Sequence, residues 1–574
     1  MTPSWRHLHP LLIVLAAVSV VEGAVRHVRV AVSADPSDAV SPRVRSRANH
    51  RTATYSAVAN PAQQNGGLSG VVTDETNRVL VAATVTATDL ESGRRFIGIT
   101  DERGEYRLLN VPPGRYEVEV SREGFETATV RSLELLVGRF ERVPFTLKVG
   151  ALQDQVTVAG DQSLVSVTTS AVSGNIDRRQ MENLPLAGRN WMELSLQVKG
   201  VAANDAGVRP GVGSDSAFQL NLDGQQVTNN GAISTVGQPK FSRNAIAEFQ
   251  VITNVFDVSQ GRSTGVQVQA VSKSGTNVRT GAVYGYFRDD ALTAKDHVAG
   301  TRLPYENQQV GGSLGGPIAK DRWHYFGSYE YEREPNTVFF RPSNLPNQSF
   351  AYEDMQKNHS ALFRTDHNAS GTSHLAYRFS MWDYRRPFLK NTEHPTQAVS
   401  RRNHADNFLV QWSHVRNAST VEELKIGYST FAWSSALAIP EMAGTPTYNF
   451  PGGAIGGIDT VPSDFKQWML TGRYDLTMTP GRHEMRIGGE FLGWRQTGEW
   501  HLIERGTYNF RANPPDLERR FPADAVTRPQ RWDLSGLDAL ATNFLQNTGD
   551  WAVDIPRPTY ALWFGDWWRV NDRL

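Results

Sequence analysis

The sequence predicts a mainly β protein: an N-terminal immunoglobulin-like β-sandwich, a mixed α+β segment, and part of a large antiparallel β-barrel. Three observations lead to this fold class. Short strand-like runs and tight turns fill residues 67–150, glycine-rich polar strands and one helix fill 151–280, and long alternating strands fill 281–574. A chain of 574 residues allows about three to five domains at roughly 100–200 residues each, so we treat these segments as separate domains.

The first 66 residues precede any predicted domain. A mainly apolar run from Leu11 to Val21 follows Arg6, and it is shorter than the about 20 residues that a membrane-spanning helix needs. We therefore expect residues 1–23 to be a secretory signal peptide. Residues 24–66 show no hydrophobic periodicity and are expected to form a disordered linker.

Composition and motifs argue against several classes of function. Lys plus Arg equals 59 and Asp plus Glu equals 59, so no basic field is available to bind nucleic acid. The absence of cysteine excludes disulfides, thiolate metal sites and thiol catalysis. Gly261–Gly265 matches the G-x-S-x-G nucleophile motif, but a strand follows it where a helix is required. With no metal-binding histidine motif either, we expect no enzyme, no cofactor and no metal site.

Residues 67–150 alternate short strands with turns such as Asp101–Gly104 and Pro112–Gly114. Three of its motifs are Gly70-Val71-Val72-Thr73-Asp74, Thr100-Asp101-Glu102-Arg103-Gly104-Glu105-Tyr106 and Val111-Pro112-Pro113-Gly114-Arg115-Tyr116. Through these motifs the segment resembles the carboxypeptidase regulatory-like domain. The resemblance implies a non-catalytic sandwich with a carbohydrate-binding-like fold, which either binds sugar or serves as a spacer.

The segment 151–280 mixes one short helix with polar strands. The helix is expected over Asp177–Asn183, with Asp177 as its N-cap and Pro185 ending it. Strands are expected at Leu220–Gly224, Ala247–Val251 and Gly265–Val271. Such a polar domain suits the wet lumen of a barrel better than a compact enzyme core.

From residue 281 onward, strands alternate strictly between apolar and polar side chains. Trp468, Leu470 and Tyr474 form one face of such a strand, and Gln467 and Arg473 belong to the other. A soluble sandwich would explain each strand equally well, but the connections decide between the two. Short turns (317–322, 366–373, 417–420 and 479–482) alternate with long connections (334–358, 385–406, 434–464 and 500–557), which is typical of outer-membrane barrels.

Aromatic and acidic side chains of this segment add to that interpretation. Twelve of the 14 tryptophans follow residue 320, and several are expected at strand ends in interfacial girdles: Trp323, Trp433, Trp563, Trp567 and Trp568. Glu330, Glu332 and Glu334 share one strand face, where we expect a lumen-facing or rim stripe, not a cation site. About ten strands fit into 281–574, and a barrel of that size could not admit the segment of about 130 residues that precedes it, so the barrel is expected to be truncated.

Two further motifs carry a second resemblance, which runs from about residue 151 to the end. Lys273-Ser274-Gly275-Thr276-Asn277 and Gly311-Gly312-Ser313-Leu314-Gly315-Gly316-Pro317 look like those of the Oar-like TonB-dependent receptors. The resemblance implies a plug domain over 151–280, seated in a barrel of about 22 strands whose first part is 281–574. It also implies an outer-membrane location in a Gram-negative-type bacterium, in contact with outer-membrane lipid.

A short segment before the plug resembles the Ton box, which pairs edge to edge with the energy-coupling protein TonB. Its residues are Asp154, Gln155, Val156, Thr157, Val158 and Ala159. Strand addition needs only an extended segment with free backbone groups, so the alternative is the last strand of the sandwich.

The function predicted from these segments is a TonB-dependent receptor or transporter for an extracellular ligand that the sequence does not identify. The rival hypothesis is a surface adhesin or glycan-binding protein, in which the barrel is only an anchor.

Overall fold

The computed structural model describes residues 65–568 and 570, with gaps at 151–154, 158–172, 185, 187–189, 199–200, 202–217, 229–237, 254–258, 260–265, 293, 296–301, 303–305, 390–393 and 418. The predicted signal peptide, residues 24–64 of the predicted linker and the motif Gly261–Gly265 therefore lie outside the described residues. Within the described residues, no helix is long and apolar enough to cross a membrane.

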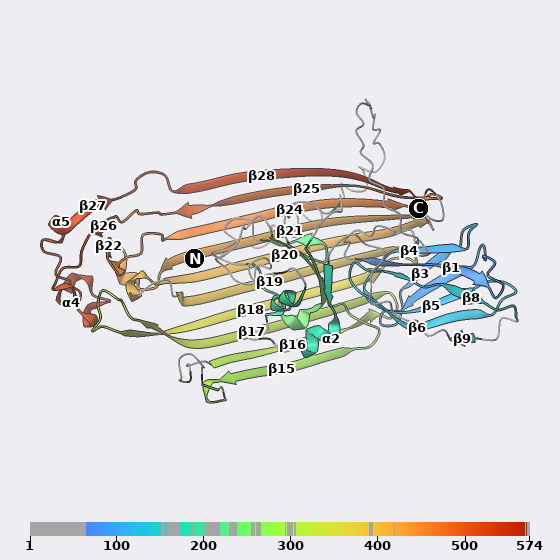
Figure 1. Ribbon diagram of the computed structural model, residues 1–574, viewed down its shortest axis with the longest axis horizontal. Helices are drawn as coiled ribbons and strands as arrows, with labels where there is room; N and C mark the ends of the chain where they lie inside the picture. Colours follow the sequence, from blue (N-terminus) through green and yellow to red (C-terminus); the bar gives the residue numbers. More distant parts are fainter. Residues whose placement is uncertain are drawn as a thin grey trace, which may run out of the picture. The chain divides into compact units, whose positions relative to one another are not determined.

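The N-terminal domain is a sandwich of two sheets (Figure 1). One sheet has the order β4-β1-β7, with β8 also paired to β1: β1 (Gly66–Asp74), β4 (Glu105–Val111), β7 (Phe140–Arg142) and β8 (Phe145–Leu147). The other has the order β3-β2-β5-β6-β9: β2 (Thr84–Asp89), β3 (Arg95–Ile99), β5 (Gly114–Ser121), β6 (Thr127–Leu135) and β9 (Gln155–Thr157). Alternate side chains of the strands meet between the sheets, because successive residues of a strand point to opposite faces.

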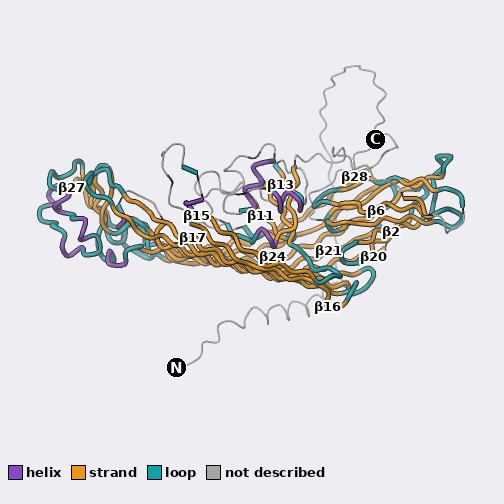
Figure 2. Tube along the Cα trace, turned by 90° about the horizontal axis from the view of Figure 1, so that it is seen from below, coloured by secondary structure: helices purple, strands orange, loops and turns teal. Residues whose placement is uncertain are grey.

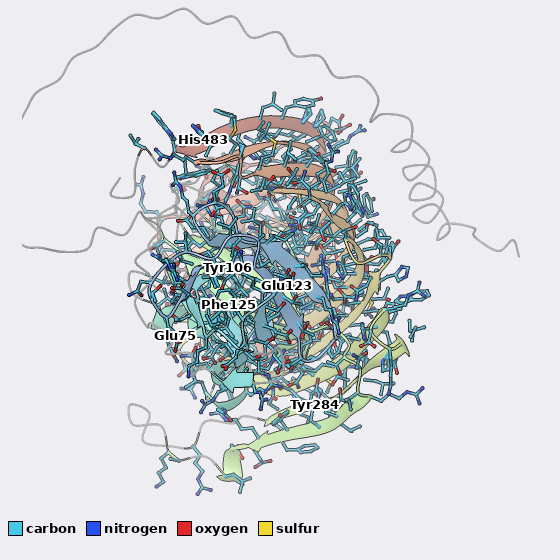
Figure 3. The ribbon with its side chains drawn as sticks, turned by 90° about the vertical axis from the view of Figure 1, so that its right-hand side faces the viewer. Glu75, Tyr106, Glu123, Phe125, Tyr284 and His483 are labelled. Carbon is cyan, nitrogen blue, oxygen red and sulfur yellow. The ribbon has the colours of Figure 1, made fainter. Side chains whose placement is uncertain are left out.

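Tyr106 lies in the core of the sandwich, among its strands (Figure 3). Its ring is buried, and its hydroxyl donates to the carbonyl of Val143 at 2.7 Å, so the polar end of this core residue is satisfied. The sequence did not predict β6. Ser132 adopts a φ of 60°, which interrupts the inside–outside alternation of that strand and hides its periodicity.

The plug is a five-stranded sheet of order β10-β13-β14-β11-β12. Its strands are β10 (Ser173–Ile176), β11 (Phe218–Leu222), β12 (Gln225–Gln226), β13 (Ile246–Ile252) and β14 (Val266–Ser272). The predicted helix is confirmed as α2 (Arg178–Asn183), with Asp177 and Gln180 forming a capping box. Every residue of β13 and β14 is buried, and Phe326 and Leu362 from the barrel pack against the plug core.

The third part is a ten-stranded antiparallel sheet in sequence order, seen as one layer in Figure 2. Its strands are β15 (Thr280–Asp289), β16 (Glu306–Ala319), β17 (Trp323–Phe340), β18 (Phe350–Asn368), β19 (Ser373–Leu389), β20 (Val399–Asn417), β21 (Thr420–Leu437), β24 (Ser463–Met478), β25 (His483–Trp500) and β28 (Ala552–Trp568). Tyr284 on β15 and His483 on β25 lie toward opposite edges of the sheet (Figure 3). The predicted faces are confirmed: Trp468, Leu470 and Tyr474 are exposed, whereas Gln467 is buried.

The connections alternate in length as predicted, but the long ones are shorter than expected. β17 and β18, for example, stay paired as far as Phe340 and Phe350, within the predicted connection 334–358. The strict apolar–polar alternation is lost there, because Val338, Phe340 and Phe350 at the strand ends are buried in an apolar cluster of the long connections.

The tryptophan girdle is confirmed only in part. Trp323 and Trp568, near the short-turn end of the sheet, are exposed. The expectation was wrong for Trp433 and Trp563, which are buried: Trp433 stacks on Phe465 and Trp563 lies against Arg473. Position near a strand end does not reveal which face a side chain takes, and a shift of one residue reverses that face.

Candidate functional site

A tight turn of the plug forms the centre of the candidate site. Asp223 and Gly224 join β11 to β12, with Leu222 opposite Gln225 in the ladder. Asp223 has a φ of 51° and Gly224 a φ of 77°. Two consecutive positive φ values define the two-residue hairpin turn that Asp-Gly favours.

The Asp223 carboxylate accepts bonds from both the plug and the barrel wall. Ser272, at the end of β14, donates from its backbone N–H at 2.9 Å and from its hydroxyl at 2.6 Å. Arg364 of β18 approaches Oδ1 at 3.2 Å, and Arg378 of β19 approaches Oδ2 at 3.0 Å. Arg364 also makes a two-bond pair with Asp366, at 2.8 and 2.9 Å. We name Asp223, Ser272, Arg364, Asp366 and Arg378 the Asp223 cluster.

The Asp223 cluster balances two carboxylates against two guanidinium groups and is almost closed to solvent. Asp223 is 3% exposed and Arg378 is 2% exposed. Burial alone would raise the pKa of Asp223, but Arg364 and Arg378 outweigh it and hold the pKa below its usual range. The carboxylate therefore stays ionised at neutral pH. Loss of any one member would leave a buried charge without its full compensation.

Other polar contacts attach the plug to further barrel strands. The amide of Gln225 donates to the carbonyl of Phe408 at 3.1 Å and to the hydroxyl of Ser429 at 3.0 Å. Gln225 also accepts from Arg378. The plug is thus tied through one hairpin to β19, β20 and β21, and to β18 through Asp223.

Two more contacts lie away from that hairpin. Ser242 of the plug donates to Glu330 of β17 at 2.9 Å, and Arg473 of β24 donates to the carbonyl of Ser259 at 3.0 Å. The predicted glutamate stripe faces this interior: Glu332 accepts from Asn307 and Gln309, and Glu334 accepts from Gln356. Glu332 is buried, so the stripe forms part of a polar interior network and not an open rim.

The glycine-rich motif of β16 lies where the plug approaches the wall. A Cβ atom on Gly275 would lie 2.2 Å from the carbonyl oxygen of Tyr325, and one on Gly315 would lie 3.7 Å from Cα of Gly275. Gly275 in particular allows the backbone of the plug end to touch β17. Glycine at position 275 is therefore required by the close approach of two backbones.

A second candidate region lies at the long-connection end of the sheet. Its four-stranded sheet, of order β23-β22-β26-β27, consists of β22 (Thr447–Phe450), β23 (Gly453–Gly456), β26 (Thr507–Phe510) and β27 (Ala541–Leu545). β22 and β26 come from different connections, yet both read Thr-Tyr-Asn-Phe and pair in parallel, like residue beside like residue. Tyr448 stacks on Tyr508 and Phe450 on Phe510, with centroids 5.6 and 4.3 Å apart. Stacking of identical rings gives the two connections one shared core.

The structure places the predicted Ton box only in part. Gln155–Thr157 form β9, whereas Asp154, Val158 and Ala159 lie outside the described residues. β9 does not belong to the plug sheet that carries Asp223. It pairs with β6 and extends a sheet of the sandwich. Among the described residues, no group of three or more His, Asp or Glu side chains is placed to hold a metal ion.

Sequence reasoning missed the Asp223 cluster. Its Asp-Gly turn was visible as the end of a predicted strand, but the partners of Asp223 lie 141 and 155 residues further along the chain. An inward-facing arginine on each of two neighbouring barrel strands was the available signal, because a charge on the inner face of a barrel needs a partner.

Comparison with known proteins agrees with this architecture. The carboxypeptidase regulatory-like domain family matches residues 67–148, and the outer membrane beta barrel domain family matches residues 271–349 and 334–574. The TonB-dependent transporter Oar of Myxococcus xanthus is 27% identical over 288 residues, covering 46% of this chain and 26% of that protein. This match confirms the predicted resemblance to Oar-like proteins. The chain spans about a quarter of the length of this curated relative.

Matches among solved structures include two outer-membrane proteins. The outer membrane transporter YddB from Escherichia coli is 13% identical, with a TM-score of 0.48 over 69% of this chain and 54% of that chain. The siderophore receptor PirA from Acinetobacter baumannii is 14% identical, with a TM-score of 0.41 over 57% of this chain and 48% of that chain. From the two family matches, this chain belongs to the outer membrane beta barrel domain family, carries a carboxypeptidase regulatory-like domain ahead of the barrel, and is an outer-membrane protein.

Proposed function

We propose that the chain acts as a TonB-dependent outer-membrane transporter of an extracellular ligand. The observation that carries the proposal is the Asp223 cluster, through which a separate small sheet is attached to the inner face of the barrel wall. The Oar relative, a TonB-dependent transporter, supports the same class of activity.

The chemistry of the attachment suits a plug that seals and then moves. Hydrogen bonds and ion pairs can be exchanged for water when the plug shifts, so their net contribution to holding it is about 1 kcal/mol each. A fully apolar interface of the same size would cost about 25 cal/mol for each Å² exposed. Several polar contacts therefore hold the plug at rest and still allow it to be released by a pull.

The pull would come from the periplasm. In this proposal the short turns face the periplasm, the long connections face outward, and TonB pairs with the segment 154–159. The ligand binds at the long connections and the top of the plug. The outer membrane holds no nucleotide, so the energy is supplied from the inner membrane through TonB.

The test uses the absence of natural cysteine. Ala270 on β14 is a small, buried plug residue, so Ala270→Cys introduces a thiol that a membrane-impermeant maleimide reaches only when the plug moves. We expect labelling in energised cells given spent growth medium as the source of ligand, and none in cells without TonB. Arg511→Cys, at an exposed position of a long connection, is the control and should label in both.

Equal protection of the Ala270→Cys thiol in cells with and without TonB would contradict the proposal. The rival interpretation, a barrel that only anchors an adhesive or glycan-binding surface, predicts that outcome.

A further inference from the structure

The segment between the sandwich and the plug is held against the sandwich sheet. β9 pairs in parallel with β6, with Thr127 opposite Gln155 and Thr129 opposite Thr157. The preceding chain is also fixed: the N–H of Glu126 donates to the carbonyl of Lys148 at 2.8 Å, and Phe125 bridges to Val149. The sandwich therefore contacts the chain at Lys148 and Val149 and again at β9.

β9 is an edge strand of its sheet, whose order is β3-β2-β5-β6-β9. One side of β9 pairs with β6, and no second strand pairs with it in the part of the chain that the structure describes. An extended strand with one paired and one open side is the form to which another protein can add a strand through main-chain hydrogen bonds.

We propose that the sandwich presents the coupling segment to TonB: β6 holds Gln155–Thr157 extended, and a strand of TonB pairs with the open side of β9. The complex would then be one continuous sheet, with TonB extending the sandwich. This inference rests on the proposed function, because it takes Gln155–Thr157, the described part of the predicted Ton box, as residues that bind TonB.

The physical reason is conformational entropy. A free segment must be ordered when it binds, and each ordered backbone residue lowers the affinity. Because β6 already orders three residues, we expect presentation to tighten TonB binding by about tenfold or more. If β6 instead hid the segment from TonB, breaking the β6–β9 pairing would tighten TonB binding.

The first experiment breaks the β6–β9 pairing alone. Thr127 is the first residue of β6, and the pairing of β6 with β5 begins only at Ala128. Thr127→Pro is therefore expected to disturb the start of the β6–β9 pairing while leaving the printed β5–β6 pairs in place, and proline is tolerated at the start of a strand. In the full chain in detergent, we expect the affinity for the purified periplasmic domain of TonB to fall about tenfold. Arg95→Pro, at the start of β3 on the opposite edge, is the matched control and should leave the affinity unchanged.

The second experiment locks the pairing. Thr127→Cys with Gln155→Cys places two thiols in register in a chain that has no other cysteine. Mild oxidation should form a disulfide, and the locked chain should bind TonB at least as tightly as the reduced chain. Failure to form the disulfide, loss of binding on locking, or tighter binding by Thr127→Pro would each overturn the inference.

A third variant separates this inference from the proposed function. Val156→Pro fixes the backbone of the coupling segment itself and removes its donor. If Val156→Pro binds TonB normally, the coupling segment lies elsewhere, and both the Ton box and its presentation are refuted. If Val156→Pro abolishes binding while Thr127→Pro has no effect, only the presentation by the sandwich is refuted.

Discussion

Asp223→Asn tests whether the Asp223 cluster holds the plug. The substitution keeps the shape of the side chain but leaves Arg364 and Arg378 with only Asp366 as a carboxylate partner. Removing one member of a buried ion pair costs about 3–5 kcal/mol. We expect about 3 kcal/mol here, because Asp366 still neutralises Arg364. Since about 1.4 kcal/mol corresponds to a factor of ten, the plug hairpin should open roughly 100-fold more often.

Hydrogen exchange of the β11–β12 hairpin and β14, followed by mass spectrometry on the full chain in detergent, measures that opening. Glu423→Gln is the control: Glu423 is also buried but pairs within the wall, with Lys425 at 2.8 Å and Gln411 at 2.6 Å. It should leave plug exchange unchanged. The reasoning is refuted if Asp223→Asn changes plug exchange less than threefold, or if Glu423→Gln loosens the plug equally.

Three further changes address the connections and the plug seat. Burial lowers the pKa of His394 from 6.5 to about 3, so its unfolded state binds more protons between these values. The contribution of neutral His394 to the stability of the 394–398 turn should therefore be fully present above pH 6.5 and be lost as the pH drops toward 3. His394→Gln should remove this pH dependence, measured by hydrogen exchange corrected for intrinsic rates. Phe450→Ala removes the stack on Phe510 and should destabilise the β22–β26 sheet by about 3–5 kcal/mol. Limited proteolysis should then cut this sheet faster than in the unchanged protein. Cleavage confined to the barrel strands would contradict the prediction. Gly275→Ala places a methyl group against Tyr325 and should raise plug exchange; an unchanged rate would show that the contact relaxes freely.

The duplicated tetrapeptide shows how a local sequence signal acquires meaning only in three dimensions. Thr-Tyr-Asn-Phe at 447–450 and at 507–510 suggests two similar short strands, but not that they meet. The structure pairs them in parallel, and Asn449 donates to Asn509 at 2.8 Å. Two separate connections thereby share one small sheet.

The sequence by itself determined the kinds of elements in this chain. Period-two alternation identified the barrel strands and their faces, turn residues separated the sandwich strands, and Asp177 marked the start of α2. These features arise from residues close together in the chain, where the geometry of a strand or a helix start imposes a fixed spacing.

Only the tertiary structure decided which distant residues meet. Asp223 finds Arg364 and Arg378 because the plug sheet lies against the inner side of β18 and β19. Trp433 and Trp563 turn inward because strand register, not proximity to a strand end, sets the face of each side chain. Ion pairs and strand register depend on which surfaces pack together. The spacing of residues along one strand does not specify which surface will pack against that strand.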